Sequence, residues 1–96
     1  MIVVVAEILI HTGRQELFVA ACRRNFEYVL KVPGCRSLRL VRGITDPACF
    51  RIVAEWENLE SLTEGFFRSE EFARWREDVS DYYVDLPVVE WTVCVE

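Results

Sequence analysis

The first hydrophobic run of the chain, residues 2–10, reads IVVVAEILI and is β-branched over most of its length, which predicts a strand. Its even positions are all apolar, and its odd positions are apolar apart from Glu7. A strand that is apolar on both sides is normally covered on both sides. We therefore expect helices on one face of its sheet and another protein surface on the other face.

A helix is predicted next, over residues 14–31. Thr12 is placed to cap its start, with Gln15 at the third helical position of a capping box, and the Pro-Gly pair at 33–34 ends it. Its buried side is predicted from helical spacing to hold Phe18, Cys22, Asn25 or Phe26, and Val29. One side of this helix therefore packs on the sheet and the other is solvated.

The later strands are predicted at residues 35–42, 48–57 and 88–95. The turn residues at 43–47 make a hairpin of the first two. With a second helical segment between the third and fourth strands, the order is β-α-β-β-α-β. This is the α+β, ferredoxin-like arrangement, with an antiparallel sheet in the order 4-1-3-2 and both helices on one face. The 96 residues are expected to form one domain.

The second helical segment is predicted in two pieces. Asn58 is the predicted cap of a short first piece, Gly65 the predicted interruption, and Ser69 the predicted cap of a second piece. The second piece carries an apolar stripe at helical spacing, made of Phe72, Trp75, Val79 and Tyr82. A helix broken in this way leaves a gap over the sheet. We expect an apolar pocket there, lined by Phe66, Phe67, Phe72 and Trp75.

The composition favours a partner of the same kind. The chain is 52% hydrophobic, which is high for a small monomer, and the two helices leave one apolar sheet face bare. A second copy packed sheet against sheet is the simplest cover, so we expect a homodimer through the open sheet face.

The charge balance and the cysteines narrow the class of protein. The net charge is −5 and Lys and Arg form no long run, which argues against binding nucleic acid or an anionic membrane. The first strand is too short to cross a bilayer and carries no basic leader, so no signal peptide or membrane span is predicted. Four cysteines without CxxC spacing and one His give no metal pattern. We expect reduced cysteines and a cytoplasmic protein.

Four short motifs occur in a characteristic order. They are Pro33-Gly34-Cys35 entering the second strand, Asp46-Pro47 before the third, Glu55-Trp56-Glu57 leading into the helix, and Ser69-Glu70-Glu71-Phe72 at its restart. In this order and spacing the chain resembles the antibiotic biosynthesis monooxygenase family of dimeric α+β barrels. The resemblance implies a ferredoxin-like homodimer with a pocket between helices and sheet in each protomer. It also implies oxygenation of aromatic polyketides or quinols without metal or flavin, or haem degradation.

Two departures from the family pattern bear on the chemistry. Many members carry a His where this chain reads Glu64-Gly65-Phe66-Phe67. The haem-degrading branch uses an Asn in the first strand, a Trp in the broken helix and an iron-ligating His, and the matching places here hold Ile8, Phe66 and a position near Arg76. Without an axial ligand in the helix, haem degradation is not expected, and we expect no cofactor.

Oxygenation without a cofactor needs a base, oriented donors and aromatic walls in a dry pocket. The candidate walls are Phe66, Phe67, Phe72, Trp75, Trp56 and Tyr82, although plain core packing also explains the residues on the stripe. Asn25 and His11 are the candidate catalytic residues, against a local hydrogen bond for Asn25 and an incidental turn position for His11. Arg51 either pairs with Glu7 or Glu55, or steadies an anionic substrate.

Two functions stay open at this point. The first is a cofactor-free monooxygenase acting on a small aromatic ligand, such as a polyketide intermediate or a quinol. The second is a dimer of the same fold that binds a small ligand or serves assembly without catalysis, since a shared fold does not establish chemistry.

Overall fold

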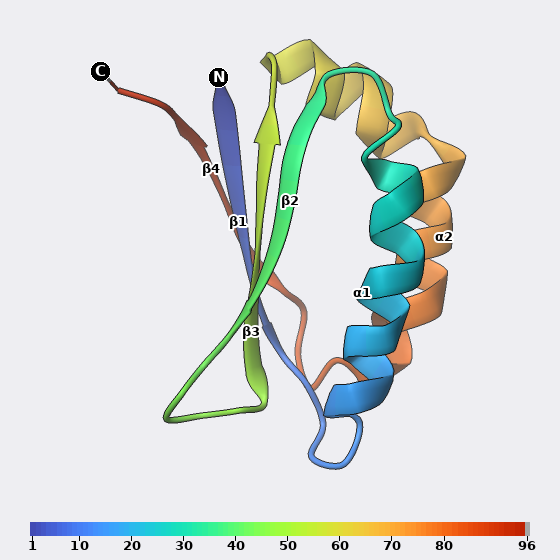
Figure 1. Ribbon diagram of the computed structural model, residues 1–96, viewed down its shortest axis with the longest axis vertical. Coiled ribbons are helices and arrows are strands. Elements are labelled where there is room, and N and C mark those ends of the chain that lie inside the picture. The colour runs from blue at the N-terminus through green and yellow to red at the C-terminus, as the bar shows by residue number, and fades with distance from the viewer. Residues whose placement is uncertain (96) are drawn as a thin grey trace.

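All four strands belong to one antiparallel sheet, and all helices lie on one face of it (Figure 1). The computed structural model describes residues 1–95. Its elements in chain order are β1 (Ile2–Leu9), α1 (Gln15–Val29), β2 (Cys35–Arg42), β3 (Cys49–Trp56), the π-helical turn η1 (Ser61–Gly65), the 3-10 turn η2 (Phe66–Arg68), α2 (Glu70–Val79), the 3-10 turn η3 (Ser80–Tyr82) and β4 (Val88–Val93). The sheet order β2-β3-β1-β4 is the predicted order read from the other edge, which confirms the ferredoxin-like fold.

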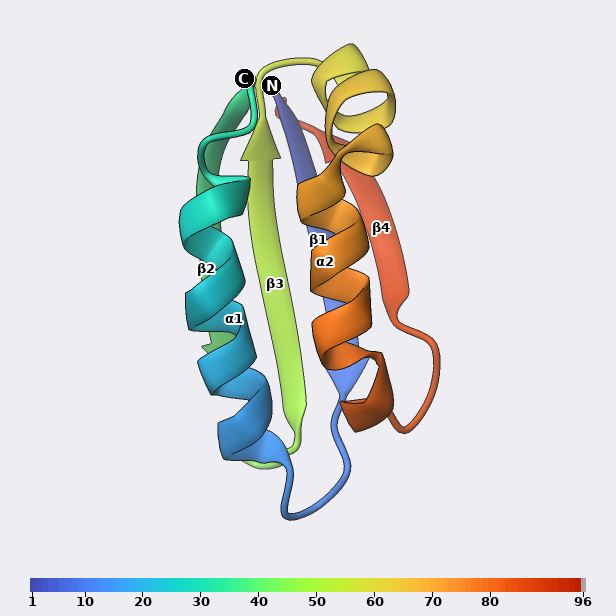
Figure 2. The ribbon, with the colours of Figure 1, turned by 90° about the vertical axis from the view of Figure 1, so that its right-hand side faces the viewer.

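The strand β1 lies in the middle of the sheet and fixes which residues face the helices. Its Val4 is opposite Ala54 of β3 on one side and Trp91 of β4 on the other. The even positions of β1 face the helices, where Ile8 is fully buried, and the odd positions face the opposite side. The helices α1 and α2 lie side by side over the sheet, with α2 in front of β1 (Figure 2).

The core between the helices and the sheet consists of two buried clusters. The first is built from Ile8, Ile10, Phe18, Ala21, Cys22, Phe50 and Val79. The second is built from Val4, Val29, Val32, Ala54, Trp56 and Leu62. The predicted buried side of α1 is confirmed, and Asn25 rather than Phe26 is the fully buried residue at the position left open.

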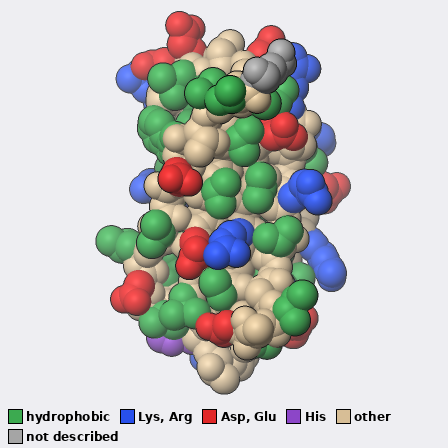
Figure 3. Space-filling view, turned by 90° about the vertical axis from the view of Figure 1, so that its left-hand side faces the viewer, with side chains coloured by type: hydrophobic (Ala, Val, Ile, Leu, Met, Phe, Trp, Pro, Cys, Tyr) green, Lys and Arg blue, Asp and Glu red, His purple; other side chains and the backbone are tan. Residues whose placement is uncertain are grey.

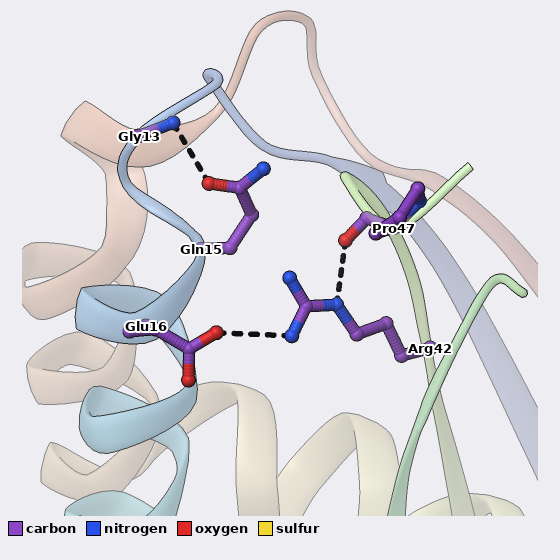
Figure 4. Close-up of polar contacts among 5 residues, drawn as sticks. All are labelled: Gly13, Gln15, Glu16, Arg42 and Pro47. Atoms are coloured by element: carbon purple, nitrogen blue, oxygen red, sulfur yellow. Dashed lines mark hydrogen bonds and ion pairs between the residues drawn. The ribbon is translucent and has the colours of Figure 1, made fainter.

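The start of α1 differs from the predicted capping box. Arg14 precedes the helix without a side-chain cap, and the predicted cap Thr12 is an exposed turn residue. The side chain of Gln15 instead accepts a hydrogen bond from the backbone N–H of Gly13 at 2.8 Å (Figure 4). Gly13 has a φ of +91°, a turn conformation that favours glycine. This φ is not helical, so the helix cannot begin directly after Thr12.

Arg42 ties the β2–β3 hairpin to the start of α1. Its Nη1 lies 3.0 Å from a carboxylate oxygen of Glu16, and its Nε donates to the carbonyl of Pro47 at 2.7 Å (Figure 4). Both side chains of the pair are exposed, so its contribution to stability is small. Its main effect is to fix the end of the hairpin against the helix.

The second helical segment breaks at Ser69 and not at Gly65. Gly65 has helical dihedral angles, φ −88° and ψ −75°, and the helix continues through it from η1 into η2. Ser69 is extended, with ψ 157°, and its hydroxyl oxygen accepts a hydrogen bond from the N–H of Phe72 at 3.1 Å. The predicted caps are confirmed at Ser69 and at Asn58, whose Oδ1 accepts from the N–H of Ser61 at 2.9 Å. The interruption predicted at Gly65 is wrong, because a glycine breaks a helix only where the backbone leaves the helical region.

Gly34 holds the start of η1 close to the turn before β2. It has a φ of +91°, and its carbonyl accepts a hydrogen bond from the N–H of Glu57 at 2.8 Å. A Cβ at this position would collide with the side chain of Ser61, so only glycine allows this approach. The entry of the broken helix is thereby fixed over one end of the sheet.

The face of the sheet that carries no helix has apolar side chains along β1, as predicted, interspersed with acidic and basic ones (Figure 3). Val5 of β1 lies opposite Val53 of β3 at its centre, and Leu9 is 38% exposed. Arg51 lies on this face and pairs with Glu7 at 3.2 Å, which is the first of the two roles considered for it.

Within residues 1–95, all four cysteines are free thiols, and no three His, Cys, Asp or Glu side chains gather in a way that could bind a metal ion. In the same range no helix has the length and apolar character needed to cross a membrane.

The cap at Ser69 gives a test of the helix break. Ser69→Ala is expected to lower the free energy of unfolding by about 1 kcal/mol, because the N–H of Phe72 loses its acceptor. Urea unfolding followed by circular dichroism measures this. Thr12→Ala is the matched control, and its expected change is below about 0.5 kcal/mol because Thr12 is an exposed turn residue. Equal losses in the two variants would contradict this account of the two helix starts.

Candidate functional site

A cavity of about 590 Å³ lies between the sheet and the broken helix. Its floor is the helix-facing side of the sheet, including Ala6, Ile52 and Ala54. The alanines in this floor have no side chain long enough to reach the helical layer. Together with the break at Ser69, these small residues leave space where a continuous helix over larger residues would close it.

Aromatic rings form the wall of the cavity. The ring of Phe66 lies 5.0 Å from Trp56 and 4.9 Å from Phe72, measured between centroids. Phe67 lies 5.0 Å from Phe72 and 5.6 Å from Trp91. These tilted contacts are among the arrangements that aromatic pairs prefer. The result is a continuous aromatic surface of five rings, which we call the aromatic wall.

The structure brings together five of the residues predicted for the pocket. The lining includes Phe66, Phe67, Phe72, Trp75 and Trp56. Trp91 of β4 also lines it and was not predicted as a pocket residue, although the alternation of β4 put it on one face with Val89 and Val93. Its position opposite Val4, a helix-facing residue of β1, turns that face toward the cavity.

Tyr83 lines the cavity in place of Tyr82, which the helical stripe had predicted. Both tyrosines pack against the first core cluster, but Tyr82 does not line the cavity. The helix tightens into the 3-10 turn η3, and the backbone at Tyr83 becomes extended and pairs with Ile10. A stripe extrapolated at 3.6 residues per turn therefore loses its phase at this point.

Three further predicted site residues lie away from the cavity lining. Asn25 is 3% exposed, and its amide donates hydrogen bonds to the carbonyl of Ala21 and to Asp78 Oδ2, both at 2.9 Å. It therefore links α1 to α2 and is the local structural alternative considered for it. His11 is exposed in the turn after β1, and Arg51 is on the opposite face of the sheet.

The polar side chains of the cavity come from one short segment. Apart from the indole N–H groups, they are Arg76, Ser80 and Tyr83. Burial raises the pKa of Tyr83 well above its usual range, and the neighbouring Cys22 raises it further. The hydroxyl of Tyr83 is therefore neutral and able to donate a hydrogen bond at any physiological pH.

Comparisons with protein families, with protein sequences and with solved structures give consistent matches. A sequence model of the family described as "Antibiotic biosynthesis monooxygenase" matches residues 1–78. The uncharacterized protein YczJ of Bacillus subtilis is 28% identical over 81 residues, which are 84% of this chain and 85% of that protein. The crystal structure of a Bordetella bronchiseptica protein named after the same family aligns with a TM-score of 0.91 at 27% identity, over 99% of this chain and 97% of that one.

A second structure named after that family, from Nitrosomonas europaea, aligns with a TM-score of 0.91 over 100% of both chains. Its identity is 19%, so it supports the fold alone.

The buried thiol of Cys22, a neighbour of Tyr83, predicts that the stability of the protein depends on pH. Burial raises the pKa of Cys22 from 9.0 to about 12, so above pH 9 the unfolded chain loses this proton and the folded protein keeps it. Stability must then fall as the pH rises through 9 and beyond. Between pH 8 and pH 10 the Cys22 contribution to this fall is about 1.4 kcal/mol.

The measurement is urea unfolding of the wild type and of Cys22→Ala at both pH values. The wild type is expected to lose more free energy of unfolding than Cys22→Ala over this interval, whatever the absolute stabilities. Cys94→Ala, which removes an exposed cysteine, should keep the wild-type dependence. An equal loss of free energy of unfolding between pH 8 and pH 10 in all three proteins would contradict the raised pKa of Cys22.

Proposed function

The chain belongs to the antibiotic biosynthesis monooxygenase family, and on this premise we propose that it oxygenates a small aromatic compound, a polyketide intermediate or a quinol, without a cofactor. The observation that carries the proposal is the apolar cavity of about 590 Å³ with its aromatic wall. A cavity of this size is typical of sites for small organic ligands.

The aromatic wall suits a planar ligand. Rings at centroid separations of about 5 Å, such as Phe67 with Phe72 and with Trp91, present edges and faces that a further ring can stack against. The floor of small aliphatic residues adds apolar contact and keeps water out. In such a site a substrate anion is less solvated and each nearby dipole acts more strongly.

The reaction needs only the substrate and O2. With an anthrone, one proton of the activated CH2 leaves to water at the mouth of the cavity, and the carbanion delocalises into the ring oxygen. It passes one electron to O2, the two radicals combine to form a C–O bond, and the peroxide anion takes up a proton. Loss of the second C–H proton breaks the O–O bond and releases hydroxide. One oxygen atom becomes the new carbonyl and the other becomes water, with all four electrons supplied by the substrate.

A specific observation favours the second candidate function, a dimer that binds a ligand without catalysis. No His or carboxylate is among the described side chains that line the cavity, so no ordinary general base stands beside the ligand. The proposed oxygenase must therefore act on substrates whose C–H or O–H is already acidic. A binder carries no such restriction.

We also propose that two copies pair through the open sheet face. Val5, Val53 and Leu9 are apolar and face away from the helices, and burying such side chains is worth roughly 1.5–3 kcal/mol each. The Arg51–Glu7 pair lies on the same face and would be shielded from water with them. The dimer implied by the family would account for the apolar side chains on this face.

Oxygen uptake tests the oxygenase proposal. With an anthrone or a hydroquinone, uptake is expected above that of buffer and unchanged by chelator. Ala54→Phe fills the cavity floor and is expected to lower the rate about tenfold or more, whereas Ala73→Phe, on the exposed side of α2, keeps it. Circular dichroism establishes that both variants fold. Binding without uptake for every such substrate would favour the non-catalytic alternative.

Light scattering at micromolar concentration tests the dimer. The wild type is expected at twice the chain mass of 11.2 kDa, and Val53→Lys at the single mass, because the lysine brings a charge into the apolar face. Val84→Lys, an exposed valine outside the sheet, should remain dimeric. A wild-type protein whose mass from light scattering is that of a single chain would contradict the proposal.

A further inference from the structure

The polar residues of the cavity follow one another along the end of α2 and η3. Arg76 and Ser80 are one turn apart, and the N–H of Ser80 donates to the carbonyl of Arg76. The N–H of Tyr83 donates in turn to the carbonyl of Ser80 at 3.3 Å. All three side chains line the same cavity, so its polarity is concentrated along one wall segment. The hydrogen bond from Asn25 to Asp78 holds this segment against α1.

Arg76 is the charged residue of the described lining. Its guanidinium lies 4.9 Å from the ring centroid of Phe72, a cation–π contact with a member of the aromatic wall. Four arginines of the chain are paired with carboxylates, and Arg76 is one of the six with no described carboxylate within ion-pair distance. A cation without a carboxylate partner beside an apolar cavity attracts an anion, and it does so in a protein whose net charge is −5.

Tyr83 adds a donor without adding charge. Its hydroxyl has no hydrogen-bond partner among the described residues. The oxygen is accessible to solvent, since no fully buried side-chain N or O atom in that range lacks a partner. A neutral hydroxyl can donate to an anionic oxygen, and hydrogen bonds to ions are the strong ones. Ser80, between Arg76 and Tyr83, offers a second hydroxyl.

We propose that Arg76 and Tyr83 bind the ionised oxygen of the substrate, and that the substrate is a planar aromatic anion, with a phenolate, enolate or carboxylate at one edge and apolar rings elsewhere. This inference rests on the proposed function, because it concerns the same cavity. The rings contact the aromatic wall and the oxygen points toward α2 and η3. A cation beside the oxygen stabilises the anion, so Arg76 and Tyr83 lower the pKa of the substrate group and promote loss of its proton. No His or carboxylate is among the described side chains that line the cavity.

A pair of probes of equal size separates charge from apolar binding. They are 2-naphthoate, which is anionic at pH 7, and 2-naphthalenemethanol, which is neutral. Calorimetry gives the affinities, and quenching of the three tryptophans, Trp56, Trp75 and Trp91, reports occupancy because all three line the cavity. The wild type is expected to bind the naphthoate about tenfold more tightly than the alcohol.

Arg76→Gln is expected to reduce this preference to within about twofold while leaving the affinity for the alcohol unchanged. Tyr83→Phe is expected to weaken naphthoate binding about threefold to tenfold with little effect on the alcohol. Arg74→Gln is the matched control, because Arg74 is on the same helix, its guanidinium lies 5.5 Å from the ring of Tyr28, and it does not line the cavity. It removes the same charge and should keep the preference.

The outcomes distinguish this inference from the function on which it rests. If the wild type binds the alcohol but shows no preference for the naphthoate, the anion site is refuted and an aromatic cavity remains. An equal loss of preference in Arg74→Gln would show a general effect of net charge and would also refute it. If neither probe binds or quenches the tryptophans, both the anion site and the proposed aromatic ligand fail.

Discussion

The structure depends on a central strand that is apolar on both faces while the chain supplies helices for only one of them. The even residues of β1, such as Val4 and Ile8, form the core under α1 and α2. The odd residues, such as Val5, meet Val53 on the bare face. Burial of apolar surface is the main driving force of folding, so a strand of this kind favours cover on its second side as well. The fold and the proposed dimer follow from the same strand.

The cavity is a second consequence of how the helical layer meets this sheet. Ser69 has an extended backbone between η2 and α2, which separates the aromatic residues of the two turns from those of α2. Beneath them Ala6 and Ala54 provide a shallow floor. A cavity with apolar walls persists because the rings of the aromatic wall support one another at the distances favoured by aromatic pairs. The break at Ser69 and the alanines of the floor therefore leave the space without the displacement of a side chain.

The chemistry that this cavity can perform is limited by its few polar groups. Asn25 and His11, which the sequence suggested for catalysis, are used in a helix–helix hydrogen bond and in an exposed turn. What reaches the cavity is a cation, Arg76, and neutral hydroxyl groups, of which Tyr83 is the most buried. Such groups stabilise an anion but do not abstract a proton at neutral pH. For an oxygenase this favours substrates that are intrinsically acidic, whereas a protein that only binds its ligand has no such restriction.

The sequence by itself determined the order of strands and helices, the two-sided apolar character of β1, the caps at Asn58 and Ser69, and five aromatic residues of the cavity, Phe66, Phe67, Phe72, Trp75 and Trp56. These follow from alternation, helical spacing and cap chemistry, which are local properties that nearby residues decide. The tertiary structure alone decided which tyrosine lines the cavity, because the 3-10 turn η3 and the pairing of Tyr83 with Ile10 change the helical phase. It also decided the placement of Trp91, through the register of β4 on β1, and the partner of Asn25, which is distant in sequence. Contacts of this kind depend on how separate elements meet, and no periodicity within one element encodes them.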